Sequence, residues 1–222
     1  VSVNQVITIN RTTPTLTVAS SNTINVDDIF TALVNTTATF GRGGAITFSI
    51  TAGSGSATVN VNTGEITGIS VGTVTQTVYA AGTSTYGAAS ISRSITVLQG
   101  VQMLTVTTAN TLNVGDTLTS TVTRTTTGGR GGAITFAVVA GSGSATVNAT
   151  TGVLIATGAG TITLLVNAAG DSNYSAASVS QSITIGKSTP TLTASLSGTL
   201  AVDRSLTVTV NSTAGAGRGG AI

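Results

Sequence analysis

Residues 46–97 read ITFSITAGSGSATVNVNTGEITGISVGTVTQTVYAAGTSTYGAASISRSITV, and a close copy of this stretch follows 88 residues later. Between residues 41–98 and 129–186, 35 of the 58 positions are identical and the alignment needs no gap. The segment GRGGAI occurs three times at the same spacing, with its arginines at Arg42, Arg130 and Arg218. A regular period of this length predicts a tandem array of whole domains and argues against a solenoid of small repeats.

Within each repeat, apolar residues alternate with Thr or Ser at a period of two, which is typical of strands with one buried face. NTG at 62–64 and TTG at 150–152 place a glycine where a hairpin favours positive φ. Strand-like runs in the second repeat lie at 104–108, 118–125, 133–139, 144–148, 152–157, 160–168 and 177–185. This spacing predicts an all-β chain of β-sandwich domains with about seven strands each.

The composition argues against catalysis. The chain has no His and no Cys, which excludes disulfides, thiolate chemistry and cysteine metal sites. Its acidic residues are Asp27, Asp28, Glu65, Asp116, Asp171 and Asp203. No carboxylate pair among them is preserved between the repeats, so no general acid and base are evident. We therefore predict that the protein is not an enzyme and needs no cofactor.

Other classes of partner lack a signature as well. Charged residues make up 6% of the chain, the net charge is +2, and no Lys/Arg cluster or aromatic platform suggests nucleic-acid binding. No apolar run approaches the roughly 18 residues of a membrane helix, so we predict no membrane insertion in this segment. Calcium would need several carboxylates together. The predicted junctions around 98–100 and 186–188 carry none, and Thr83 stands where the second repeat has Asp171.

The chain ends define the predicted domain organisation. Residues 1–9 align with 89–97 and 177–185 and are therefore predicted to be the last strand of a preceding repeat. The first repeat then spans 10–98, the second 99–186, and a partial third 187–222. One interpretation is a window of a longer repetitive protein. The other is a subunit that exchanges strands with neighbouring copies.

The stretch 46–97 resembles the bacterial immunoglobulin-like repeats (Big, or invasin/intimin type) of surface adhesins and fibre proteins. The matching elements are ITF, GSGSATVN, NTG before an apolar strand, VGT, and GxSxYxAAS leading into SITV. The resemblance covers both full repeats and the flanking pieces. It implies tandem immunoglobulin-like sandwiches at the cell surface. Proteins of this kind act as stalks, adhesins or decorations of phage structural proteins.

Two functions remain open at this point. The chain is either a structural extracellular array within a surface filament, sheath or fibre, or the stalk of a large bacterial adhesin that carries its binding domain elsewhere. The scarcity of charge favours assembly, because few charged groups would have to lose their water when sandwiches pack together. Self-association with other copies or with neighbouring repeats is therefore the partner that we predict, with a glycan as a further candidate.

Five residues are candidate contact sites between domains or chains. Arg42, Arg130 and Arg218 are the charges repeated in every unit and could contact a neighbouring chain or a glycan. The interpretation that we favour is structural: each arginine folds over its glycine-rich loop and donates to local carbonyl groups. Tyr86 and Tyr174 precede the last strand of each repeat. We expect them to cover one end of the sandwich or to pack at the domain junction.

The two interpretations of the arginines give different results for Arg130→Ala. A structural arginine loses hydrogen bonds to its own loop, so the free energy of unfolding should fall by roughly 1 kcal/mol while self-association persists. Denaturant unfolding and analytical ultracentrifugation measure the two quantities. Loss of association in a variant of unchanged stability would contradict the structural interpretation.

Overall fold

The computed structural model describes residues 2–38, 43–125 and 131–212. Within these ranges all regular secondary structure is β-strand, and no helix there is long and apolar enough to cross a membrane. Contacts divide the chain into two compact units, the first made of 1–105, 122–135 and 166–179, and the second of 106–121, 136–165 and 180–222. The predicted fold class, all-β with tandem sandwiches, is confirmed.

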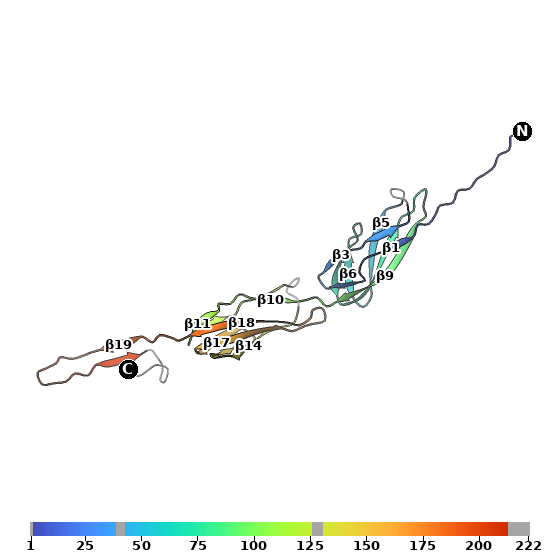
Figure 1. Ribbon diagram of the computed structural model, residues 1–222. Coiled ribbons are helices and arrows are strands. Elements are labelled where there is room, and N and C mark those ends of the chain that lie inside the picture. Colours follow the sequence, from blue (N-terminus) through green and yellow to red (C-terminus); the bar gives the residue numbers. More distant parts are fainter. Residues whose placement is uncertain (1, 39–42, 126–130, 213–222) are drawn as a thin grey trace. The chain divides into compact units, whose positions relative to one another are not determined.

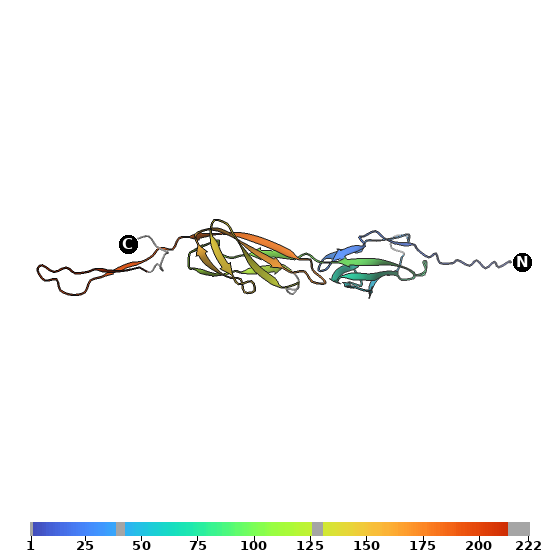
Figure 2. The same cartoon turned by 90° about the horizontal axis from the view of Figure 1, so that it is seen from below.

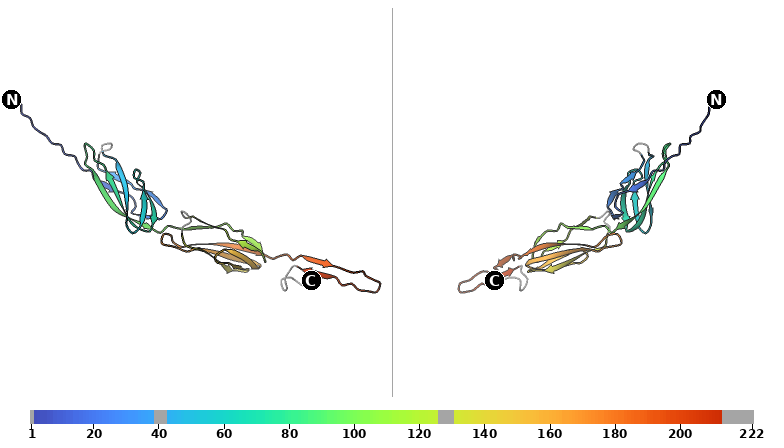
Figure 3. Two further views of the ribbon diagram at one scale, coloured as in Figure 1. Left: turned by 180° about the vertical axis from the view of Figure 1, so that it is seen from behind. Right: turned by 45° about the vertical axis from the view of Figure 1, so that its right-hand side comes forward.

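The first nine strands build one sandwich within the first unit (Figures 1 and 3, blue to green). They are β1 (Leu16–Val18), β2 (Thr23–Asn25), β3 (Ile29–Thr31), β4 (Val34–Thr36), β5 (Ile46–Ala52), β6 (Ser56–Val59), β7 (Glu65–Ser70), β8 (Gly72–Ala80) and β9 (Ala89–Leu98). One sheet has the order β2-β9-β8-β5 and another β3-β7-β6, while β1 pairs with β4. Strand β2 runs parallel to β9, and the other pairs in this sandwich are antiparallel.

The core of this sandwich follows from the alternation along its two longest strands. Alternate residues of β8 and the end of β9 point inward, and Val74, Val78, Ile95 and Val97 are 0–1% exposed. The Thr and Ser residues between them cover the outer face of the sheet. These inward residues belong to two apolar clusters. One cluster includes Ile66 of β7, and the other includes Leu16 of β1 and Phe48 of β5.

The next nine strands repeat this arrangement (Figure 2, green to orange). They are β10 (Met103–Val106), β11 (Thr111–Asn113), β12 (Thr117–Thr119), β13 (Val122–Thr125), β14 (Ile134–Ala140), β15 (Ser144–Val147), β16 (Val153–Gly158), β17 (Gly160–Ala168) and β18 (Ala177–Gly186). The sheet orders are β11-β18-β17-β14 and β12-β16-β15, with β10 beside β13. Each order matches its counterpart among the first nine strands.

One predicted strand is wrong. The run 118–125 was expected to be continuous, but it breaks at Ser120 and Thr121 into β12 and β13. The cause is a change of sheet, because β12 pairs with β16 while β13 pairs with β10. Ser120 is buried at the break and donates its amide to the Gly152 carbonyl oxygen at 3.0 Å. Strand β11, at 111–113, was not among the predicted runs. Since alternation continues unbroken through 118–125, periodicity alone does not reveal the break.

The predicted glycine turns are confirmed, and their packing explains them. Gly64 has φ of +73° and Gly152 has φ of +68°. A Cβ atom on Gly64 would lie 2.7–3.0 Å from the ring of Phe48, and one on Gly152 would lie equally close to the ring of Phe136. Both the backbone angle and the aromatic ring therefore select glycine at this position.

The flanking segments are exposed. Residues 2–10 lie outside any strand, and β19 (Leu192–Ser195) pairs antiparallel with β20 (Thr209–Ser212). The assignment of 1–9 to a preceding repeat, and of 187–222 to a partial third one, stays a prediction. So do the boundaries of the repeats at 10–98 and 99–186.

The core assignment can be tested with a matched pair of isoleucines. Ile95 is 0% exposed and Ile29 is 60% exposed. Ile95→Ala should lower the free energy of unfolding by about 2–5 kcal/mol, because it leaves a cavity between the sheets. Ile29→Ala should change it by less than about 1 kcal/mol. Denaturant titration followed by circular dichroism gives both values, and equal losses would contradict the burial described.

Candidate contact site at the tyrosine loops

The structure describes two of the five candidate residues. Arg42, Arg130 and Arg218 lie outside the described residues, so both interpretations of the arginines stay predictions. Tyr86 and Tyr174 are described, and each lies in the loop before the last long strand of its repeat. Tyr174 is 1% exposed, whereas Tyr86 is half-buried.

Both tyrosine loops have the same local structure, built by different side chains. In the second loop, Oδ1 of Asp171 accepts hydrogen bonds from the amides of Asn173 and Tyr174, both at 2.8 Å. In the first loop, Oγ1 of Thr83 accepts from the amides of Thr85 and Tyr86, at 3.3 and 3.1 Å. Aspartate and threonine both form such side-chain turns. The exchange of Asp171 for Thr83 therefore preserves the loop.

The other half of the site is the turn between β2 and β3. The Asp28 amide donates to the Asn25 carbonyl oxygen at 3.2 Å, and the Asn25 side chain donates to the Asp28 carboxylate at 2.7 Å. Asp27 occupies the third position of the turn with φ of +70°. This angle is uncommon for a residue with a side chain, although aspartate and asparagine tolerate it better than most.

Tyr174 packs against this turn. Its ring joins the apolar cluster that contains Ile24, Val26 and Val97. Its hydroxyl donates to Oδ2 of Asp27 at 2.5 Å, across 147 residues of sequence. A hydrogen bond to a carboxylate contributes about 1.5–3 kcal/mol, more than one between neutral groups. All of these residues belong to the first compact unit.

Backbone contacts surround the tyrosine. The Val71 amide donates to Oδ1 of Asn173 at 3.0 Å. The Gly100 amide donates to the Asn173 carbonyl oxygen at 2.8 Å, and the Ser175 amide donates to the Gly100 carbonyl oxygen at 3.0 Å. The loop 171–175 is thus fixed by side-chain and main-chain contacts at once.

Gln102 holds the base of the same loop and was not predicted. It is 3% exposed, and its Nε2 donates to the carbonyl oxygens of Ala169 and Ser175 at 3.0 and 2.7 Å. The only sequence signal was that glutamine stands where the other two repeats have Pro14 and Pro190. Proline has no N–H group with which to donate a hydrogen bond, so the prolines of the other repeats cannot make these two contacts.

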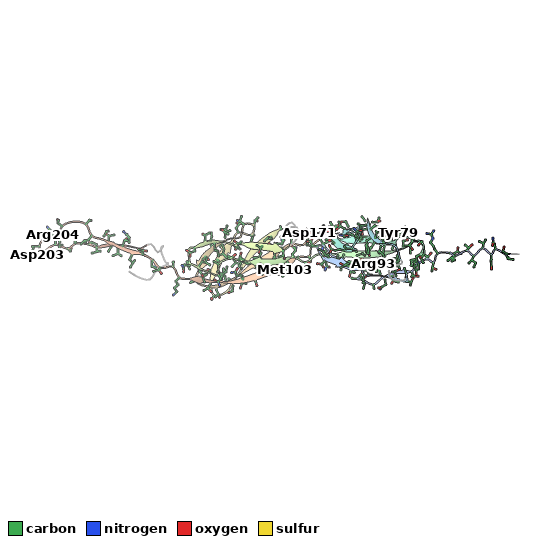
Figure 4. The ribbon with its side chains drawn as sticks, turned by 90° about the horizontal axis from the view of Figure 1, so that it is seen from above. Tyr79, Arg93, Met103, Asp171, Asp203 and Arg204 are labelled. Carbon is green, nitrogen blue, oxygen red and sulfur yellow. The ribbon has the colours of Figure 1, made fainter. Side chains whose placement is uncertain are left out.

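A second polar cluster lies inside the first sandwich and was also missed. Arg93 and Gln76 are direct partners across β9 and β8, and Nε of Arg93 donates to Oε1 of Gln76 at 2.7 Å. The guanidinium of Arg93, which is labelled in Figure 4, also donates to the Ser20 carbonyl oxygen at 2.7 Å. It lies 5.8 Å from the ring centre of Phe30. Partial burial lowers the pKa of the Arg93 guanidinium by desolvation. The sequence signal for this cluster is that both residues differ together in the second repeat, where Leu164 stands for Gln76 and Gln181 stands for Arg93.

The chemistry of these sites is that of structural contacts. Among the described residues, no group of three or more His, Cys, Asp or Glu side chains is gathered where a metal ion could bind. The carboxylate of Asp27 accepts from a phenol, and that of Asp171 accepts from two backbone amides. The arrangement positions a loop against a turn.

The chain matches no protein-family model and no curated protein. Solved structures that it is similar to include Drosophila N-cadherin EC1-3 (13% identity, TM-score 0.31, 75% of this chain and 64% of that one). Fibronectin(III)-like modules of Clostridium thermocellum CbhA are similar as well (14%, TM-score 0.30, 78% and 95%). So is the C-terminal 282-residue fragment of intimin in complex with the intimin-binding domain of its translocated receptor (14%, TM-score 0.29, 84% and 67%). This chain thus spans less than two thirds of the N-cadherin chain, and TM-scores this low carry no functional argument.

The Arg93 cluster gives a double-mutant test. Gln76→Leu should lower the free energy of unfolding by about 1–3 kcal/mol, because the half-buried guanidinium loses an acceptor. Adding Arg93→Gln should recover most of this loss. The pair then matches Leu164 and Gln181, whose glutamine Nε2 donates to the Thr108 carbonyl oxygen at 2.8 Å. Denaturant unfolding of the four proteins gives the coupling energy, and strictly additive losses would contradict the contact.

Proposed function

We propose that this chain is part of a structural extracellular array of bacterial immunoglobulin-like repeats within a surface filament, sheath or fibre. The observation that carries the proposal is the contact of the Tyr174 side chain with the turn at Asp27. Tyr174, which the sequence assigns to the second repeat, and Asp27, which it assigns to the first, meet in one compact unit through a buried ring and a hydrogen-bonded carboxylate. Such a contact would hold consecutive repeats of an array together, because a covalent linker alone leaves neighbouring domains free to move.

The composition of the strands supports the same proposal. With 6% charged residues, the outward positions of the sheets are mainly Thr and Ser, and neutral hydroxyl groups lose less solvation energy than charges when surfaces come together. The paired sheets in the described residues contain no disulfide, since the chain has no cysteine. Their cohesion therefore comes from apolar packing and from hydrogen bonds between the strands.

The stalk of a large adhesin is the second candidate function. It is supported by the fact that the contact of Tyr174 with Asp27 lies within one chain. An intrachain contact would stiffen a single-chain spacer as well as a fibre. Decoration of a phage structural protein is a variant of this role.

Electron microscopy of the native full-length material, with mass determination alongside, separates the two functions. We expect ordered filaments, tubes or lattices many chains wide, because weakly charged sandwiches can pack against one another at low desolvation cost. Thin single-chain rods at the monomer mass would contradict the filament and favour the adhesin stalk.

A further inference from the structure

The turn that receives Tyr174 occurs three times in the chain. Its copies are Asn25-Val26-Asp27-Asp28, Asn113-Val114-Gly115-Asp116 and Ala201-Val202-Asp203-Arg204. In each copy the amide of the fourth residue donates to the carbonyl oxygen of the first, at 3.2, 3.0 and 3.1 Å. The third residue has positive φ in all three, +70°, +95° and +62°. The backbone is thus the same, but the third residue is aspartate, glycine and aspartate.

Glycine would be the ordinary choice at this position, because it adopts positive φ without steric cost. Asp27 therefore occupies a backbone angle that costs energy for a residue with a side chain, which raises the question of what that side chain contributes. Its carboxylate accepts the Tyr174 hydroxyl. At Gly115, by contrast, a Cβ atom would meet no other atom within 4 Å. At Gly115 the backbone angle favours glycine but no neighbouring atom among the described residues does, and the turn there lacks a carboxylate.

Burial shows that the contact covers one copy of the turn and not the other. Val26 is 2% exposed and Ile24 is 6% exposed under the Tyr174 ring. Their equivalents Val114 and Leu112 are only half-buried. The surface available for a tyrosine loop therefore recurs in the second repeat, without the carboxylate that anchors the phenol.

We infer that the third residue of this turn is an anchoring residue that sets how firmly a sandwich holds the tyrosine loop of the next one. Aspartate, as at Asp27, fixes the loop through its carboxylate, and Asp203 retains that capacity. Glycine, as at Gly115, supplies no carboxylate for such a contact. The sequence of the turns thus encodes firm and loose junctions along the chain. This inference rests on the proposed function in treating the sandwiches as an array.

Amide hydrogen exchange of the 222-residue chain tests the inference. The amides of Val71 and Gly100 donate to Asn173 in the loop and report its attachment. The Phe48 amide donates to the Val61 carbonyl oxygen at 3.0 Å in the same sandwich and reports its overall stability. In both Asp27→Gly and Tyr174→Phe, exchange at Val71 and Gly100 should accelerate by about tenfold or more, while Phe48 stays unchanged. The double variant should exchange no faster than the single ones.

Two features make the test decisive. Asp27→Gly keeps a residue that adopts this backbone angle without steric cost, and Tyr174→Phe leaves the residues of the turn unchanged, so acceleration in both variants isolates the hydrogen bond between them. Gly115→Asp is the matched control, which adds the carboxylate away from Tyr174 and should leave Val71 unchanged. Unchanged exchange at Val71 and Gly100 in both single variants would overturn the inference. Equal acceleration at Phe48 would overturn it too, because the effect would then be one of global stability.

The outcomes are separable from those of the proposed function. If microscopy shows single-chain rods, the filament fails and the exchange result still decides the role of Asp27. If exchange at Val71 is insensitive to Asp27, the anchoring residue fails while an assembly seen by microscopy stands.

Discussion

The long antiparallel pair β8 and β9, with its counterpart β17 and β18, is the constraint on which the rest of the structure depends. Its inward residues, among them Val74, Ile95 and the equivalent Ile162 and Ile183, are 0–1% exposed. With neither disulfides nor many charges, the burial of these aliphatic side chains supplies most of the cohesion, at about 25 cal/mol for each Å² removed from water. The turn that carries Asp27 is attached to both sheets. Val26 donates to the Leu98 carbonyl oxygen at the end of β9, and Asp27 donates to that of Gly68 on β7.

The same attachment recurs in the second repeat, where Val114 donates to the Gly186 carbonyl oxygen and Gly115 to that of Ala156, both at 2.9 Å. The position of the turn is therefore a property of the fold, whichever residue occupies its third position. What varies is the side chain presented on a fixed support. The difference between Asp171 and Thr83 leaves the backbone of the loop unchanged. The difference between Asp27 and Gly115 also leaves the backbone unchanged, but it removes the carboxylate that accepts the tyrosine hydroxyl.

Much of the fold was predictable from the sequence, because alternation at a period of two reports burial directly. It located β14 to β18 and the glycine turns, but it could not show that the chain changes sheets at Ser120. The tyrosine loops were recognised as candidates from their place in the repeat. The role of Asp27 was not, because the partner lies 147 residues away and the equivalent residue is glycine. Periodicity identifies which face is buried but not which distant group completes a polar contact.

The polar pair Gln76 and Arg93 would also oppose one kind of strand exchange between neighbouring repeats during folding. Tandem domains of high identity can exchange strands, since each sheet would accept the corresponding strand of its neighbour. A misfolded sandwich with β9 beside β17 would place the Arg93 guanidinium opposite Leu164, where it has lost its glutamine acceptor. A half-buried charge deprived of a partner is costly, so such a strand exchange is disfavoured. The two sandwiches share one fold but differ at this pair of facing residues, and the difference opposes the pairing of β9 with β17.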